Sequence, residues 1–179
     1  MKHLLLPLLL LAGCATTGVP PSRMDDGWAV RRVPAGDGAV EMTWRVAGPG
    51  SGWVDERDRT SEFTWVHRDQ AATIYADSTC GDPAEDVPLT VLLNHQTFGF
   101  EDLETLAQVE VDLAGRGGLQ RIFDATLDGR PVRVGLTAVR KGPCVFDVVF
   151  VHANRDRFEG LLPDYQTVVE SLRIKERAT

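Results

Sequence analysis

The chain has 179 residues, with 19 Lys and Arg against 26 Asp and Glu, a formal net charge of −7 and an apolar fraction of 43%. This length favours one domain with a short appendage, and the apolar fraction excludes a wholly disordered chain. The acidic balance argues against general nucleic-acid binding, which relies on clustered Lys and Arg.

The first fourteen residues carry an export and anchoring signal. Met1-Lys2-His3 is a short positive start, and the apolar run 4–11 is too short to span a bilayer, which takes about 20 residues. This pattern is typical of a secretory signal peptide. The quartet Leu11-Ala12-Gly13-Cys14 resembles the bacterial lipobox. The resemblance implies cleavage before Cys14 and acylation of that cysteine; the alternative is an ordinary secretory peptide with an incidental cysteine.

The lipobox resemblance also implies a location and a division of the chain. Residues 1–13 would be the removed signal peptide, and acyl chains on Cys14 would hold the protein at the membrane. Residues 14–27, rich in Gly, Pro, Ser and Thr, indicate a flexible tether that reaches roughly 40 Å. Residues 28–179 are expected to form one domain. Because Ala15 rather than Asp follows the cysteine, we expect lipid anchoring in the bacterial cell envelope, at the outer membrane facing the periplasm.

Alternating apolar and polar residues predict a series of strands. The period of two recurs over 40–46, 63–67, 72–76, 109–113, 119–127 and 132–138. Asp128-Gly129 predicts a two-residue hairpin turn, and Lys141-Gly142-Pro143 predicts another turn. The run 144–151 is apolar on both faces except at Asp147, which predicts a central strand.

Two or three helices are expected among these strands. Asp86 is a candidate cap for the first, with Pro88 near its first turn and Gly99 at its end, and its apolar face holds Leu89, Leu92 and Leu93. Residues 101–107 are expected to add a short helical turn. Pro163 suits the first position of the last helix, whose apolar face holds Tyr165, Val168, Val169 and Leu172. Asn154 is a candidate cap for a short helical piece before it. The sequence therefore predicts an α+β domain, with an antiparallel sheet of about seven strands and two or three packed helices.

Three stretches in the C-terminal third stand out together: 127–134, 142–147 and the end of the last helix, 168–173. They resemble a group of bacterial lipoproteins whose domain is similar to the PsbP-like α/β/α sandwich. That superfamily includes a photosystem accessory protein and a nuclear-transport factor. The resemblance implies a non-enzymatic binding or accessory domain. It implies no specific ligand or functional residue, because one fold hosts many functions.

With Cys14 acylated, Cys80 and Cys144 remain. In an oxidising compartment a leftover pair tends to bridge, and we expect a disulfide, which on the chain-entropy estimate contributes roughly 4 kcal/mol. The alternative is two separate buried thiols that act as small hydrophobes. No histidine lies near either cysteine in the sequence, which disfavours a catalytic thiol.

Catalytic and ligand-binding motifs are not found in the sequence. His67, His95 and His152 fall in three different predicted elements and lack metal-ligand spacing. The Gly-rich segments 36–38, 48–52 and 115–118 lack a phosphate-loop pattern, and Ser51 is not part of a nucleophile elbow. We therefore expect no enzyme, and no catalytic, cofactor-binding or metal-binding residues.

Three acidic or aromatic features leave alternatives open. Asp77, Asp82, Glu85 and Asp86 crowd the loop around Cys80 without calcium-loop spacing, which favours a solvated loop. Asp147 needs buried partners, for which Arg133 and Arg140 are candidates, and structural pairing is favoured over a general acid. Trp44 and Trp65 fit buried sheet faces. Trp53, near Arg57 and Arg59, either plugs one end of the sheet or belongs to an exposed binding surface.

The sequence as a whole favours a lipid-anchored envelope protein with a binding or accessory domain. Its expected contacts are the membrane, through acylated Cys14, and an envelope protein of unknown identity, with no nucleic acid. Two alternatives predict different structures. An envelope hydrolase with a non-sequential site would show a deep pocket with converging polar groups. A small-ligand carrier would show an apolar cavity between helices and sheet.

Overall fold

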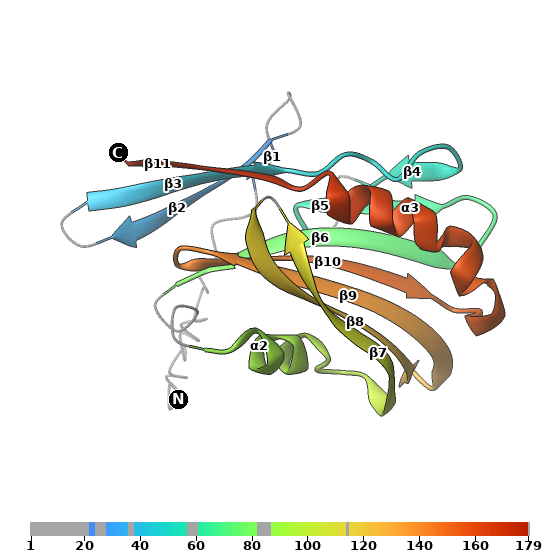
Figure 1. Ribbon diagram of the computed structural model, residues 1–179. Helices are drawn as coiled ribbons and strands as arrows, with labels where there is room; N and C mark the ends of the chain where they lie inside the picture. Colours follow the sequence, from blue (N-terminus) through green and yellow to red (C-terminus); the bar gives the residue numbers. More distant parts are fainter. Residues whose placement is uncertain are drawn as a thin grey trace, which may run out of the picture.

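The structure, a computed structural model, describes residues 22–23, 28–35, 38–56, 61–81, 87–113 and 115–178. Within these ranges the chain forms a seven-stranded and a four-stranded antiparallel sheet and two α-helices (Figure 1). The larger sheet, in the order β4-β5-β6-β10-β9-β8-β7, consists of β4 (Trp53–Asp55), β5 (Phe63–His67), β6 (Ala72–Cys80), β7 (Glu101–Leu113), β8 (Arg116–Leu127), β9 (Arg130–Lys141) and β10 (Cys144–His152). The smaller sheet, in the order β1-β2-β3-β11, consists of β1 (Ser22–Arg23), β2 (Ala29–Ala35), β3 (Gly38–Arg45) and β11 (Arg173–Ala178). The helical elements are α2 (Leu89–Gln96), the 3-10 turn η1 (Arg155–Arg157) and α3 (Phe158–Glu170).

The seven-stranded sheet separates two hydrophobic cores. One core lies between this sheet, helix α3 and the four-stranded sheet, and it contains Trp44, Phe150 and Tyr165. The other lies beneath α2 and contains Leu93 and Phe123. Strand β10, the fourth of the seven, supplies residues to both cores, as expected for a central strand. The predicted α+β class and the antiparallel sheet of about seven strands are confirmed. The four-stranded sheet was not predicted.

The predicted hairpin turn at Asp128-Gly129 is confirmed. Both residues have positive φ, 51° and 73°, and they connect β8 to β9. Two positive φ values are the requirement of a type I′ turn, whose twist matches that of the paired strands. This turn fixes the register in which β8 and β9 pair over their length.

The helices confirm part of the prediction. Helix α2 follows Pro88 and ends before Gly99, while its candidate cap Asp86 lies outside the described residues. The Asn154 side chain accepts a hydrogen bond from the Asp156 N–H and so caps η1 as expected. Pro163 was expected at the start of α3 but lies inside it, so that expectation was wrong. The helix extends one further turn because Phe158 and Leu161 are buried in the core, and this burial outweighs the missing N–H of the proline.

The short helical turn expected at 101–107 is also wrong, because these residues form the first half of β7. The pairing of β7 with β8 shifts register between Glu101 and Glu104 and again between Thr105 and Ala107. Each shift breaks the period of two, so the apolar residues no longer alternate. The result is an irregular half, 101–106, followed by a regular ladder from Ala107 to Leu113.

Candidate functional site: the β7 edge and the pocket beside α2

Strand β7 is the last strand of its sheet and pairs with β8 alone among the described strands. The side chains from Glu101 to Glu110 are all exposed. An edge strand presents backbone N–H and C=O groups to its surroundings and can serve as a template for a further strand. The regular part from Ala107 to Leu113 is the segment suited to such pairing, since the ladder there has no register shift.

This edge combines exposed apolar side chains with negative charge. Phe98, in the turn before β7, is 95% exposed, and three β7 side chains are about half exposed: Leu103 at 46%, Leu106 at 45% and Val109 at 51%. The acidic residues of the strand are Glu101, Asp102, Glu104, Glu110 and Asp112, and the strand has no Lys or Arg. We call Phe98 together with β7 the β7 edge. Its chemistry suits a partner segment that carries both apolar and basic side chains.

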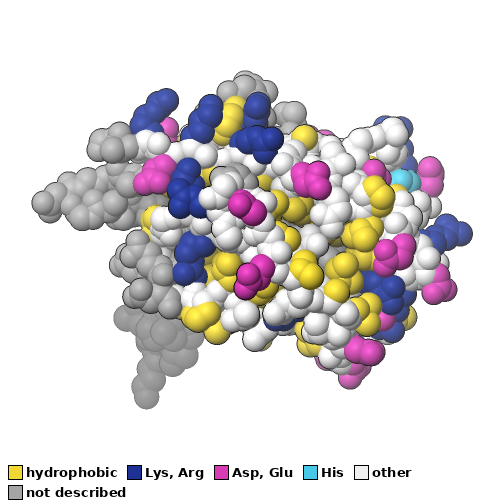
Figure 2. Space-filling model, viewed as in Figure 1, with side chains coloured by type: hydrophobic (Ala, Val, Ile, Leu, Met, Phe, Trp, Pro, Cys, Tyr) yellow, Lys and Arg dark blue, Asp and Glu magenta, His cyan; other side chains and the backbone are white. Residues whose placement is uncertain are grey.

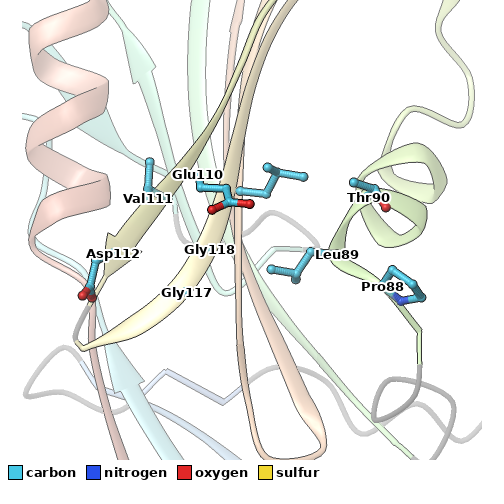
Figure 3. A pocket seen from close by; sticks show the side chains of 9 residues that line it. Pro88, Leu89, Thr90, Glu110, Val111, Asp112, Gly117 and Gly118 are labelled. Carbon is cyan, nitrogen blue, oxygen red and sulfur yellow. The ribbon is translucent and has the colours of Figure 1, made fainter.

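A pocket of about 610 Å³ lies between the start of α2 and the hairpin of β7 and β8 (Figure 3). Glu110 and Asp112 contribute carboxylates, while Leu89 and Thr90 approach from the helix. The full lining consists of Pro88, Leu89, Thr90, Glu110, Val111, Asp112, Gly117, Gly118 and Leu119. These residues include no His, Cys or Ser, and two carboxylates stand in the wall. The two carboxylates would attract a cationic group at this wall of the pocket.

One lining residue of the pocket, Gly118, can only be glycine. A side chain at Gly118 would place its Cβ 2.9 Å from the Ala138 carbonyl oxygen, so only glycine fits against β9 at this point. Arg121 on β8 joins the two neighbouring elements. Its Nε donates a hydrogen bond to Gln108 Oε1 on β7, and its Nη1 donates one to Asn94 Oδ1 on α2. Both bonds are 2.8 Å long. Arg121 thus connects α2 and β7 to the same residue of β8.

The buried Asp147 has a partner on α2 that was not expected. Its carboxylate is 2% exposed and accepts a hydrogen bond from Gln96 Nε2 of α2 at 3.4 Å. Burial raises the pKa of Asp147 well above its usual value, and the carboxylates of Asp77 and Glu62 raise this pKa further. Burial and the negative charges of Asp147 and Asp77 raise the pKa of Tyr75 to about 12.

The two candidate arginines contact other groups. Arg133 lies in register with Asp124 and binds it through two hydrogen bonds, 2.7 and 3.1 Å long. It lies on the opposite face of the sheet from Asp147, because Ala138, the register partner of Asp147, is five residues away along β9. The expectation that Arg133 pairs with Asp147 is therefore wrong. Arg140 donates from Nη2 to the carbonyl oxygen of Val87.

The disulfide partners face each other across two central strands. Cys80 on β6 and Cys144 on β10 are register partners, and their sulfur atoms are 2.07 Å apart. This bond ties the end of β6 to the start of β10. Cys14 lies outside the described residues, as do the whole expected signal peptide 1–13 and most of the expected tether 14–27. Ser22–Arg23, within the expected tether, pairs with β2.

The aromatic and histidine candidates are dispersed. Trp44 and Trp65 are buried as expected. Trp53 is only 8% exposed and its Nε1 donates to Asp164 Oδ2 at 2.9 Å, so it plugs one end of the sheet and the exposed alternative is wrong. Arg57, Arg59, Asp82 and Glu85 lie outside the described residues.

Of the histidines, His67 is on β5, His95 on α2 and His152 on β10. Burial lowers the pKa of His152, and Arg157 and His67 lower it further. Among the residues that the structure describes, no three His, Cys, Asp or Glu side chains form a group that could hold a metal ion. No helix in the described ranges is long and apolar enough to cross a bilayer.

Comparisons with known proteins place the fold. No protein-family model matches the sequence, and no curated protein matches it. The solved structure of LpqN from Mycobacterium tuberculosis, described as involved in cell envelope biogenesis, matches with a TM-score of 0.56 and 16% identity, over 83% of this chain and 91% of that one. This likeness shows a shared fold.

Two further solved structures are similar over most of their length. Cyanobacterial PsbP from Synechocystis matches with a TM-score of 0.48 and 12% identity, over 92% of this chain and 99% of that one. A Mog1 mutant matches with a TM-score of 0.48 and 11% identity, over 80% of this chain and 95% of that one.

Proposed function

We propose that this protein is a lipid-anchored protein of the cell envelope whose domain binds a partner chain along the β7 edge, without catalysis. The β7 edge is the observation that carries the proposal. It offers a regular ladder from Ala107 to Leu113 with exposed backbone groups, flanked by the exposed side chains of Phe98 and Leu106. The lipobox ending at Cys14 supports the location, and the fold shared with LpqN is in keeping with it.

The partner expected at this edge is an extended segment that adds a strand to the sheet. Its backbone would pair with β7 from Ala107 onward, and its Lys or Arg side chains would meet Glu110 and Asp112 in the pocket wall. An apolar side chain of the same segment would cover Phe98 beyond the irregular half of β7, because aromatic contacts often supply much of the binding energy of an interface. Acylated Cys14 would keep the domain near membrane-bound partners and raise their effective concentration.

Site-specific crosslinking in the envelope tests the binding surface. A photo-reactive residue replaces Val109 on β7 in one strain and Val54 on β4, the opposite edge of the same sheet, in another. Both positions are exposed, so they differ in edge rather than in access. We expect a discrete adduct from position 109 that is lost on Glu110→Lys with Asp112→Lys. The same adducts from both positions, or none from position 109, would contradict the proposal.

Fractionation tests the anchor separately. Cys14→Ala should move the protein from the membrane fraction to the soluble envelope fraction, because the acyl chains supply the stable attachment. Mass spectrometry of the N-terminal peptide should show that the wild-type chain begins at an acylated Cys14. A variant that stays fully membrane-bound would exclude lipid anchoring through this cysteine.

A further inference from the structure

The four-stranded sheet is basic, although the chain is acidic. Its strands contain seven Lys or Arg and two Glu, whereas the whole chain has 19 Lys and Arg against 26 Asp and Glu. The basic residues are Arg23, Arg31, Arg32, Arg45, Arg173, Lys175 and Arg177. Figure 2 shows Lys and Arg side chains gathered at the upper left, over the part of the molecule that this sheet forms. The chain therefore has a basic end and an acidic edge strand.

The sheet register directs Arg45, Arg173 and Lys175 outward. Met42 and Trp44 on β3 are buried in the core, so the alternating positions Thr43 and Arg45 face away from it. On β11, Arg173 pairs with Arg45 and Lys175 with Thr43, which places them on the same outer face. The side chains of Arg45, Arg173, Lys175 and Arg177 are all exposed. We call this surface the basic face.

A tryptophan ring contacts two side chains of the basic face. The guanidinium carbon of Arg45 is 4.7 Å from the centroid of the Trp28 ring, and the Lys175 Nζ is 4.2 Å from it. Trp28 is only partly buried, unlike Trp44, Trp53 and Trp65. An amphipathic indole ring among Lys and Arg is the combination favoured at the headgroup level of a membrane.

The four-stranded sheet that carries the basic face also contains β1, the described strand nearest in sequence to Cys14. The step from here to the membrane rests on the proposed function. Ser22, at the start of β1, is eight residues after Cys14 and can lie at most about 29 Å from it along an extended chain. Anchoring at Cys14 would therefore hold the four-stranded sheet near the lipid surface. No comparable constraint applies to the start of β7, which lies at the far end of the seven-stranded sheet from the four-stranded sheet (Figure 1).

We infer that the basic face lies against the anionic phospholipid headgroups of the membrane in which Cys14 is anchored. Each exposed Lys or Arg near such a surface is attracted to it, and the attraction decays over about 8 Å at physiological ionic strength. The lipid anchor supplies attachment, and the basic face supplies orientation. The acidic start of β7, with Glu101, Asp102 and Glu104, is repelled by the same surface and is left accessible to a partner.

Reconstituted vesicles test this inference with the full chain, purified from membranes. The protein is mixed with vesicles of phosphatidylcholine alone or with added phosphatidylglycerol, each containing a headgroup-labelled lipid that quenches tryptophan fluorescence. We expect severalfold stronger quenching with phosphatidylglycerol. This increase should be reversed by 0.5 M salt, which shortens the screening length to about 4 Å. Trp28→Phe should abolish the difference, because the other three tryptophans are buried.

A matched pair of variants assigns the effect to the basic face. Arg45→Gln with Lys175→Gln should lower the phosphatidylglycerol-dependent binding about 25-fold, at roughly fivefold per charge. Arg68→Gln with Arg130→Gln removes the same charge from exposed positions outside the four-stranded sheet. This pair should change the phosphatidylglycerol-dependent binding less than twofold. Circular dichroism checks that both double variants are folded. If one of them misfolds, the salt dependence of the wild-type binding still tests the inference.

The outcomes separate this inference from the anchor. A chain that floats with pure phosphatidylcholine vesicles but shows no response to phosphatidylglycerol overturns the inference and keeps the anchor. A chain that floats only with phosphatidylglycerol vesicles, and is released by salt, loses the anchor and keeps the basic face. Equal responses in the two double variants, or capture of an acidic protein by this face without any response to phosphatidylglycerol, would also overturn the inference.

Discussion

Asp147 on β10 and Asp77 on β6 are register partners, so two carboxyl groups share one face of the sheet beneath α2. Asp147 is buried and accepts a hydrogen bond from Gln96, while Asp77 accepts one from the N–H of Ser78. Like charges this close oppose joint ionisation. The raised pKa of Asp147 follows from its burial first and from Asp77 second.

Asp147→Asn should stabilise the domain at neutral pH, by roughly 1–2 kcal/mol. The amide keeps the shape and the contact with Gln96 but removes a carboxyl group that resists ionisation. Urea unfolding at pH 7 measures the difference. Asp128→Asn, in the exposed turn between β8 and β9, is the control and should change the free energy of unfolding by less than about 0.5 kcal/mol.

The pH dependence of this variant has a definite sign. Because the folded pKa of Asp147 is raised, its contribution to stability is fully present below the unfolded pKa, near 4, and is lost as pH rises through the folded pKa. The wild type should therefore lose stability relative to Asp147→Asn as pH rises from 4. Parallel stability curves for the two proteins between pH 4 and 8 would show that Asp147 titrates as an ordinary carboxyl group.

Asp124 is predicted to behave in the opposite way. The hydrogen bonds from Arg133 hold the pKa of Asp124 below its usual value, so its contribution is present above the unfolded pKa and is lost as pH falls through the folded pKa. Asp124→Asn should cost about 2 kcal/mol at pH 7 and progressively less in acid. Glu159→Gln alters an exposed carboxylate 4.0 Å from the same guanidinium and should cost less than about 0.5 kcal/mol.

The bond between Cys80 and Cys144 closes a loop with a sequence separation of 64. Replacing both cysteines by serine should lower the free energy of unfolding by about 4 kcal/mol on the chain-entropy estimate. Thermal unfolding of the wild type with and without reductant measures the same difference, and the serine variant should not respond to reductant. Peptide mapping of the non-reduced protein should show one linked peptide; free thiols at both positions would contradict the pairing.

Phe98 should matter for binding and not for folding. It is 95% exposed, so Phe98→Ser should change the free energy of unfolding by less than about 0.5 kcal/mol. The crosslinked adduct from position 109 should nevertheless weaken severalfold, as expected for an aromatic contact at an interface. Val54→Ser, on the opposite edge of the sheet, should leave both quantities unchanged. A large loss of stability in Phe98→Ser would assign this residue to the core.

The sequence indicated most of the large sheet because its residues obey simple periodicities. The two-sided apolar run 144–151 predicted a central strand, and Asp128-Gly129 predicted the turn that sets the register of β8 and β9. Strand β7 was missed in its first half because two register shifts hide its alternation. Strand β11 was missed because Ile174 is the only large apolar residue among 173–178.

The candidate surfaces were harder to predict than the strands. The β7 edge carries a sequence signal, five acidic residues within thirteen, but its exposure depends on the strand order. The basic face joins β3 and β11, which lie more than a hundred residues apart, so only their pairing brings Arg45 and Lys175 to one tryptophan. The partners of Asp147 depend on which face each neighbouring arginine occupies, and sequence proximity does not fix that.

The pairing of β3 with β11 has a consequence for the order of folding. Trp44 and Ile174 are register partners, so β3 gains its second neighbour only when residues 173–178 pair with it. Without 173–178, this side of β3 is unpaired. Such long-range contacts slow folding, because the closing segment must be found across most of the chain. The four-stranded sheet should therefore be completed later in folding than the hairpin of β8 and β9, whose strands are joined by a two-residue turn.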